Sequence, residues 1–436
     1  MLKNNFVFSF FISIFLMSCV DSKINSKDFF EIDRQDYLNK LEGFWLGQSI
    51  ANWTGLITEM DKIGNVGEIK TGNFYTRENW NKNDEPNIWS PNSEYETIDF
   101  VLRNKNEIWG SDDDTDIEYM YQELMFQGNE TILSPKDIRD GWLKHMKIEE
   151  ENFLWVSNQK AFDLMNQGFL PPETSNPEFN EHFDMIDAQL TTEIFGLLSP
   201  INYKYALKMS NLPVRTTSRG DAALISEFYI IIHSLASTIN PNMPLHKELV
   251  RISDLASEIL NKDSYSYKMY DYVKKKFESG IKWEHTRDSI YNRYQVKQMD
   301  GYDITSRELY CNGCFASGIN FASSLVSYFY GKGDFKETIK IASLSGWDSD
   351  NPASTWGGLL GFIHGKTKIE NIFNEPLSNK YNIHRTRQNF ENNGLDNFKN
   401  MSKKGLSIID NVVLKTGGSV DSDENSWYIP KQKSLN

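Results

Sequence analysis

Cysteine is scarce in this chain, and basic residues are fewer than acidic ones. Only three cysteines occur in 436 residues, and the formal net charge is −14. Without a Lys/Arg stripe, this charge argues against nucleic-acid binding through phosphate contacts. Beyond the N-terminus no apolar run reaches transmembrane length, and strand-like alternation is scarce. Since 39% of the residues are hydrophobic, wholesale disorder is excluded. The pattern predicts one large, all-α domain without internal repeats.

The first 19 residues resemble an export signal that ends in a lipidation site. Lys3 supplies a positive n-region, and Phe6–Met17 is an apolar run too short to span a membrane comfortably. Leu16-Met-Ser-Cys19 resembles a bacterial lipobox, with Cys19 as the lipidated first residue. An ordinary signal peptide or a short membrane anchor is the alternative. We expect a protein of the bacterial cell envelope, periplasmic or on the outer surface, whose acyl chains bind the lipid bilayer.

This N-terminus sets the predicted boundaries. We expect a signal peptide over 1–18, a lipidated tether over 19–36 and a helical domain over 37–415. Residues 416–436 are expected to form a polar C-terminal tail, ordered only in part.

The two remaining cysteines have a C-x-x-C spacing. In an exported protein Cys311 and Cys314 could form a disulfide. The pair could also be half of a zinc site, but the sequence has no second pair to complete it. As a redox motif it lacks the strand that is expected before it. We favour two small buried residues on one helical turn.

A late acidic turn precedes a helix signal. Asp348 and Asp350 lie on an Asp-Ser-Asp-Asn turn, where Asn351 is expected to cap the helix and Pro352 to take its first position. The helix that follows is dense in glycine, which costs about 1 kcal/mol against alanine within a helix. This predicts very close packing of another backbone or a ligand.

An early acidic run, Asp112–Asp116, also opens a helix. With Thr115 as the cap, Glu118 falls at the third helical position, the capping-box spacing. Acids at helix starts are also ordinary caps, but two such turns suit one site for Mg²⁺, Mn²⁺ or Ca²⁺. We reject a calcium-binding loop, because Ile117 stands where that loop needs glycine.

These motifs resemble those of a known family. Asp112–Thr115 (DDDT), Gly346–Asn351 (GWDSDN) and the Gly-rich stretch Gly43–Gly55 are similar to the signatures of ADP-ribosylglycohydrolases, which include the dinitrogenase-reductase-activating glycohydrolase. Members carry Thr-Asp-Asp-Thr early, Gly-x-Asp-Thr-Asp-Thr late, and an opening helix that ends Gly-Asp-Ala-Leu-Gly. The resemblance implies one orthogonal helical domain around a central two-metal site.

The resemblance also implies the roles of single residues. Two divalent cations are expected, Mg²⁺ first and Mn²⁺ as the alternative, and the triple aspartate leaves the register open by one residue. The implied metal ligands are Asp112, Asp113, Asp114, Asp348, Asp350 and Asn351. The implied catalytic residues are Glu59, Asp113 and Asp350. For Glu59, an acid or base candidate, the alternative is a solvated acid on a surface loop.

Four positions depart from the family's pattern. Asp112 and Asn351 replace threonines, Asn52 replaces the acid of the opening helix, and Ser218 stands where relatives carry histidine. We take Asn52, Ser218 and Trp347 as substrate-binding candidates. Trp347, Trp53 and Trp356 could each stack on an adenine or sugar, although aromatics at such spacing more often belong to the core.

The leading hypothesis is a metal-dependent glycohydrolase that cleaves an ADP-ribosyl or related N- or O-glycosidic bond. Its substrate would be a small-molecule or protein-linked ADP-ribose-like compound. One alternative is a hydrolase of another ribosyl or sugar conjugate in the cell envelope, because an exported protein lies away from cytosolic NAD. Another is a non-catalytic binding protein that retains the fold.

Overall fold

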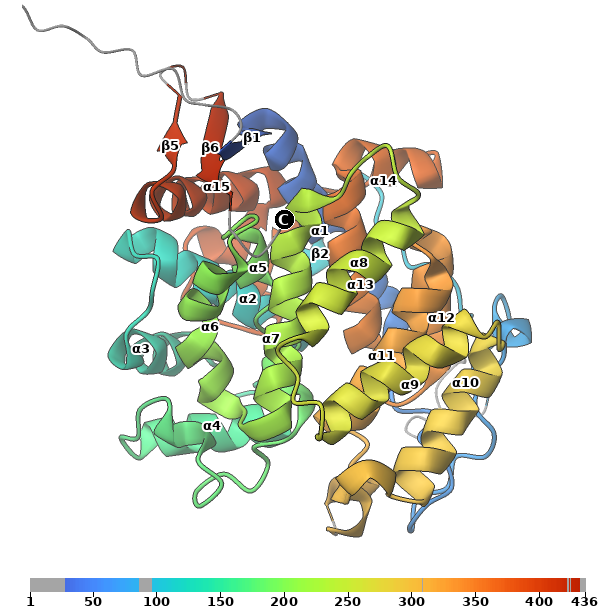
Figure 1. Cartoon of the computed structure of the whole chain (residues 1–436). Helices are drawn as coiled ribbons and strands as arrows, with labels where there is room; N and C mark the ends of the chain where they lie inside the picture. Colours follow the sequence, from blue (N-terminus) through green and yellow to red (C-terminus); the bar gives the residue numbers. More distant parts are fainter. Residues whose placement is uncertain (1–27, 86–95, 308, 422, 424, 432–436) are drawn as a thin grey trace, which may run out of the picture.

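A computed structural model describes residues 28–85, 96–307, 309–421, 423 and 425–431 of the chain. Helices dominate these residues (Figure 1), so the all-α prediction is confirmed. The α-helices are α1 (Arg34–Gly55), α2 (Asp113–Gly128), α3 (Pro135–His145), α4 (Val156–Asn166), α5 (Ile194–Leu197), α6 (Tyr203–Thr217), α7 (Gly220–Leu235), α8 (Leu245–Ser257), α9 (Tyr265–Glu278), α10 (Trp283–Ile290), α11 (Ser317–Gly331), α12 (Phe335–Ser345), α13 (Asp350–His364), α14 (Lys366–Phe373) and α15 (Phe398–Lys415).

Short strands complete the described part of the fold. They are β1 (Phe29–Asp33), β2 (Trp109–Gly110), β3 (Lys380–Asn382), β4 (Leu395–Asn397), β5 (Ser419–Val420) and β6 (Ser426–Pro430). Within the ranges that the structure describes, no helix is both long and apolar enough to cross a membrane.

Helices α1 and α13 pack antiparallel along their length with their backbones in contact, from Gly43 beside Gly361 to Gly55 beside Asp350. A Cβ atom on Gly47 would lie 2.3 Å from the Gly357 carbonyl oxygen, and one on Gly361 would lie 2.1 Å from that of Gly43. Any side chain at these positions would push the helices apart. The close backbone packing predicted from the glycine-rich helix is confirmed, and the partner is α1.

The two ends of the described chain meet in one antiparallel sheet of order β1-β6-β5. In its register Phe30 faces Ile429 and Ile32 faces Trp427. Trp427 and Ile429 are buried. The predicted polar tail is therefore wrong for strands β5 and β6, because they join this sheet and Trp427 and Ile429 belong to the core. The predicted tether also ends too late, since β1 and the start of α1 precede residue 37.

A second sheet brings the C-terminal region to the early acidic run. Strand β2 pairs parallel with β3, Gly110 facing Asn382, and β3 pairs antiparallel with β4. The acidic run begins directly after β2. The segment that follows β3 therefore lies beside the first turn of α2.

Both acidic helices begin earlier than predicted. Asp112, with extended backbone, is the N-cap of α2, and its N–H donates to the Thr115 hydroxyl at 3.0 Å. Ser349 precedes α13, so Asp350 is its first residue and Pro352 its third. Proline costs no hydrogen bond there either, because the first N–H groups of a helix have no intrahelical acceptor.

The two late cysteines are bonded to each other. Cys311 and Cys314 form a disulfide in the turn before α11, with Cα atoms 5.5 Å apart. Cys311 has a φ of 45°, so the pair does not lie on one helical turn. Both cysteines are buried, as predicted, but the expected placement on one helical turn is wrong, and the disulfide, which was an alternative, is formed.

Candidate active site

Three segments bring their acids together at the ends of α1, α2 and α13. Carboxylate oxygens of Glu59, Asp348 and Asp350 lie within 4.8 Å of one another. Those of Asp112, Asp113 and Asp350 form a second group of the same size. Asp350 belongs to both groups, so two positions able to hold a metal ion adjoin each other.

The acids form one wall of a cavity of about 620 Å³. Glu59, Asp113 and Asp348 line it, together with apolar side chains of the loops that face them. Trp155 and Tyr310 line it as well and are 51% and 61% exposed. The cavity therefore combines an acidic wall with two accessible aromatic rings.

Burial and mutual repulsion both disfavour the charged forms of these acids. Burial, and then the neighbouring carboxylates, raise the pKa values of Glu59, Asp113 and Asp350 well above their usual range. Burial likewise raises the pKa of Asp348 to about 6. A bound cation would relieve this repulsion, because it favours the charged form of each acid.

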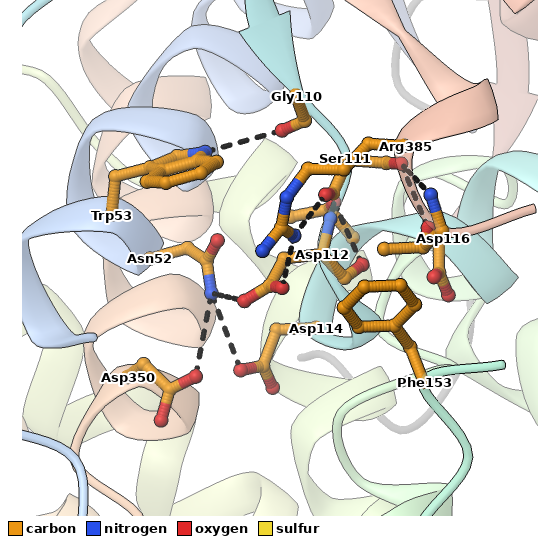
Figure 2. Close-up of polar contacts among 12 residues, drawn as sticks. Asn52, Trp53, Gly110, Ser111, Asp112, Asp114, Asp116, Phe153, Asp350 and Arg385 are labelled. Carbon is orange, nitrogen blue, oxygen red and sulfur yellow. Dashed lines mark hydrogen bonds and ion pairs between the residues drawn. The ribbon is translucent and has the colours of Figure 1, made fainter. Parts of the chain in front are cut away.

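Asn52, on the last turns of α1, points toward Asp112, Asp114 and Asp350 (Figure 2). Its Nδ2 donates to Asp112 at 3.1 Å and lies 3.4 and 3.5 Å from carboxylate oxygens of Asp114 and Asp350. Its Oδ1 and the Oδ1 of Asp350 are buried, with no hydrogen-bond partner among the described residues. Carboxylates with unpartnered buried oxygens are the donor set that a hard divalent cation requires, so the residues fit Mg²⁺ or Mn²⁺.

Asp114 and Asn351 lie outside both groups. Asn351 donates through Nδ2 to Asp114 Oδ1 at 3.0 Å, and its own Oδ1 accepts from Gln189 at 3.1 Å. In this structure the amide oxygen that was expected to bind metal faces Gln189. The ligand roles of Asp114 and Asn351 stay predictions.

Comparison with known proteins decides the family. The sequence profile described as ADP-ribosylglycohydrolase matches residues 33–398. The chain belongs to the ADP-ribosylglycohydrolase family. Membership supports a glycohydrolase activity in general, and it confirms the resemblance read from the three motifs.

The chain also has a weak similarity to a solved structure. It is titled "ADP-ribosylglycohydrolase-related protein complex" and is 14% identical, with a TM-score of 0.48 over 86% of this chain and 98% of that chain. No curated protein sequence matches the chain.

Two of the predicted substrate-binding residues of this ADP-ribosylglycohydrolase-family protein lie in the core. Trp347 is fully buried, packs on Phe74 with ring centroids 4.7 Å apart, and donates to Gln295 at 2.9 Å. Ser218 is fully buried at the end of α6. Neither lines the cavity, so the structure contradicts these two substrate contacts. Trp356 is also a core residue.

The fourth acid of the early run has a separate, structural role. Asp116 and Arg387 are both fully buried and form an ion pair at 2.9 Å. Glu123, the last position of the rejected calcium loop, pairs with Lys404 at 2.5 Å. Both carboxylates face cations of the protein, which agrees with that rejection.

Sequence reasoning missed two charged residues near the site. Asp187 lines the cavity, and burial raises its pKa to about 7. Arg385 contacts Asp112 at 2.6 Å. Neither lies in an acidic cluster or beside a motif, so the linear sequence carried no signal for them.

Proposed function

We propose that the protein is a divalent-cation-dependent glycohydrolase that cleaves an ADP-ribosyl or related N- or O-glycosidic bond. The observation that carries this proposal is Asp350, which is shared between two groups of acids. Three other members of these groups, Glu59, Asp113 and Asp348, line one cavity. Family membership supports the reaction class. Two cations bound there would polarise sugar hydroxyls and activate a water molecule.

Five acids of the site have separate roles in this proposal. Asp112, Asp113, Asp348 and Asp350 hold the cations. We assign proton transfer to Glu59, because its carboxyl lines the cavity, and burial and the neighbouring acids raise its pKa above the usual range. Asp113 and Asp350 also orient the attacking water. Asn52 holds three of the carboxylates in place through its Nδ2.

The rim supports a substrate with a planar or apolar portion. Trp155 and Tyr310 expose large aromatic faces at the same cavity that holds the acids. Such faces stack on planar groups and sugar rings. A nucleotide-linked ribose combines a planar base with the vicinal hydroxyls that hard cations bind.

The test is calorimetric titration of Mg²⁺ and Mn²⁺ into the metal-stripped protein, followed by hydrolysis assays on ADP-ribosylated peptides. We expect metal binding at two sites, lost in Asp348→Ala/Asp350→Ala and retained in the exposed control Asp263→Asn. ADP-ribose is expected to bind only when metal is present.

Three other outcomes would change the assignment. Metal binding without affinity for ADP-ribose would direct the search to other glycosides. Metal and ADP-ribose binding without turnover would indicate a binding protein that retains the fold. Absence of metal binding would overturn the catalytic proposal.

We further propose that the protein is exported and anchored in the bilayer through lipid on Cys19, which lies outside the described residues. The support is the sequence motif alone. The test is incorporation of labelled palmitate in cells, which should be lost in Cys19→Ala. Wild-type protein that is unlabelled and released in soluble form would contradict it.

A further inference from the structure

Arg385 is fixed beside the acid cluster by the second sheet. Strand β3 leads directly into a short turn, Ile383–Arg385, that packs against Ser111. The guanidinium Nη1 donates to the Ser111 carbonyl oxygen and to Asp112 Oδ1, both at 2.6 Å. Figure 2 shows the side chain of Arg385 above Asp112.

Aromatic rings and a glycine hold the same side chain. The guanidinium carbon lies 4.9 Å from the ring centroid of Trp53 and 5.1 Å from that of Phe153. A Cβ atom on Gly110 would lie 2.7 Å from Arg385 Cδ, so the stem passes only because residue 110 is glycine. Trp53 in turn donates to the Gly110 carbonyl oxygen at 3.1 Å. These contacts restrict Arg385 to the position next to Asp112.

Both oxygens of Asp112 are engaged by donors. Oδ1 accepts from Arg385, and Oδ2 accepts from Asn52 at 3.1 Å. Yet this side chain, only 4% exposed, also belongs to the group with Asp113 and Asp350 that could hold a metal ion. Arg385 is thus a protein cation already bound to one member of that group.

We infer that Arg385 is a positioning residue that acts as a tethered counter-ion: it neutralises Asp112 in the metal-free site and opposes the binding of a cation there. This inference rests on the proposed cation site. A fixed positive charge beside a divalent cation repels it. The Arg385 side chain is 34% exposed, so water screens part of this repulsion, while the buried Asp112 side keeps the rest. Arg385 therefore weakens metal binding while it stabilises the metal-free protein.

The experiment compares Arg385→Gln with wild type by Mg²⁺ calorimetry and by the melting temperature in EDTA. We expect Mg²⁺ to bind roughly tenfold more tightly to Arg385→Gln, because the repulsion is gone. The metal-free variant should melt at a lower temperature, and saturating Mg²⁺ should restore most of the loss. Arg385→Lys keeps the charge and should bind Mg²⁺ with near wild-type affinity.

Two further variants make the result specific. Arg103→Gln removes the other cation stacked on Trp53, at 5.6 Å, and should leave Mg²⁺ affinity unchanged. In an Asp112→Asn background, Arg385→Gln should lose most of its effect on the metal-free melting temperature, because its partner charge is gone.

The outcomes separate this inference from the proposed function. Unchanged or weaker Mg²⁺ binding in Arg385→Gln, with normal binding in wild type, would overturn the counter-ion role alone. Absence of Mg²⁺ binding in wild type would overturn both.

Discussion

Asp112 and Asp116 each contact an arginine from the segment after β3, Arg385 and Arg387. Asp113, between them in the sequence, lines the cavity instead, and the charges that act on it come from other acids. Aspartates of one short run therefore lie in opposite electrostatic surroundings: Asp112 and Asp116 lie beside an arginine, and Asp113 lies among other acids. The residue-scale predictions concern the acids that face one another.

The first prediction concerns Glu59→Gln. The glutamine side chain has nearly the same size and shape but cannot transfer a proton as the carboxyl does, so kcat should fall about 10²–10⁴-fold. The measurement is turnover of an ADP-ribosylated peptide under saturating metal. Glu68→Gln changes an exposed acid of the following loop and should retain full activity. Unchanged turnover in Glu59→Gln would remove Glu59 from the mechanism.

The second prediction is that the stability of the metal-free protein depends on pH and that bound metal reduces this dependence. The pKa values of Asp113, Asp350 and Glu59 are raised on folding, and that of Asp348 is raised to about 6. Their contribution to stability is therefore fully present below the unfolded-state values of about 4, and it is lost as the pH rises through 6 and above.

In EDTA the melting temperature should therefore be lower at pH 8 than at pH 5. Saturating Mg²⁺ should narrow this gap at pH 8, because a bound ligand stabilises the folded state. Thermal melts at both pH values, with and without metal, measure the effect. If Mg²⁺ raised the melting temperature equally in wild type and in Asp348→Ala/Asp350→Ala, these acids would not be the cause of the metal effect on stability.

At the scale of elements, the contact between α1 and α13 determines where the acids lie. Residue 52 is on α1, residue 350 is the first of α13, and Gly55 approaches the Asp350 backbone so closely that a Cβ there would lie 2.4 Å from its Cα. A change in the spacing of these helices would move the cluster as a whole.

The third prediction is that Gly47→Ala destabilises the protein. Its Cβ would lie 2.3 Å from a backbone oxygen of α13, and overpacking of this kind costs about 1–3 kcal/mol. Gly128→Ala is the control, because the nearest atom to its added Cβ would be 3.9 Å away, and alanine favours the helix. Urea unfolding of both variants checks the contrast, and Mg²⁺ affinity should fall only in Gly47→Ala.

At the scale of the whole molecule, the sheet β1-β6-β5 ties both ends of the described chain to α1 and α15. Trp427 is fully buried, lies 5.2 Å from the Tyr37 ring, and donates to Asp410 of α15 at 2.7 Å. The closing strand therefore stabilises the first helix of the domain.

The fourth prediction follows from this closure. Trp427→Ala should cost about 3–5 kcal/mol, the usual range for loss of a large buried aromatic. Leu414→Ala, on α15 and 58% exposed, should change stability by about 0.5 kcal/mol or less. Denaturant unfolding distinguishes them, and similar small values for both would show that the sheet is dispensable.

The fifth prediction concerns the proposed lipid anchor. Helix α1 has 22 residues, about 33 Å of rise, and it separates β1 from the cavity residues that begin at Leu56. Figure 1 shows β1 at the top of the molecule and α4, whose first residue lines the cavity, at the bottom. Lipidated protein in vesicles should therefore match the truncated soluble protein in kcat/KM on a soluble substrate, and a large loss on anchoring would contradict this orientation.

The sequence by itself determined the features that are local. Helical periodicity and scarce alternation predicted the all-α class, and two acidic turns with a glycine-rich helix predicted the family and the acids that meet. Each of these signals spans only a short stretch of the chain, because caps, turns and helix faces depend on short spacing.

Only the tertiary structure decided what depends on distant pairing. It turned the polar tail into a core strand, buried Trp347 and Ser218, and placed Arg385 against Asp112, 273 positions earlier in the chain. The sequence around a charged residue does not indicate which distant residue it will contact in the folded protein. The fold selects that partner when the β2–β3 pairing brings the two segments together.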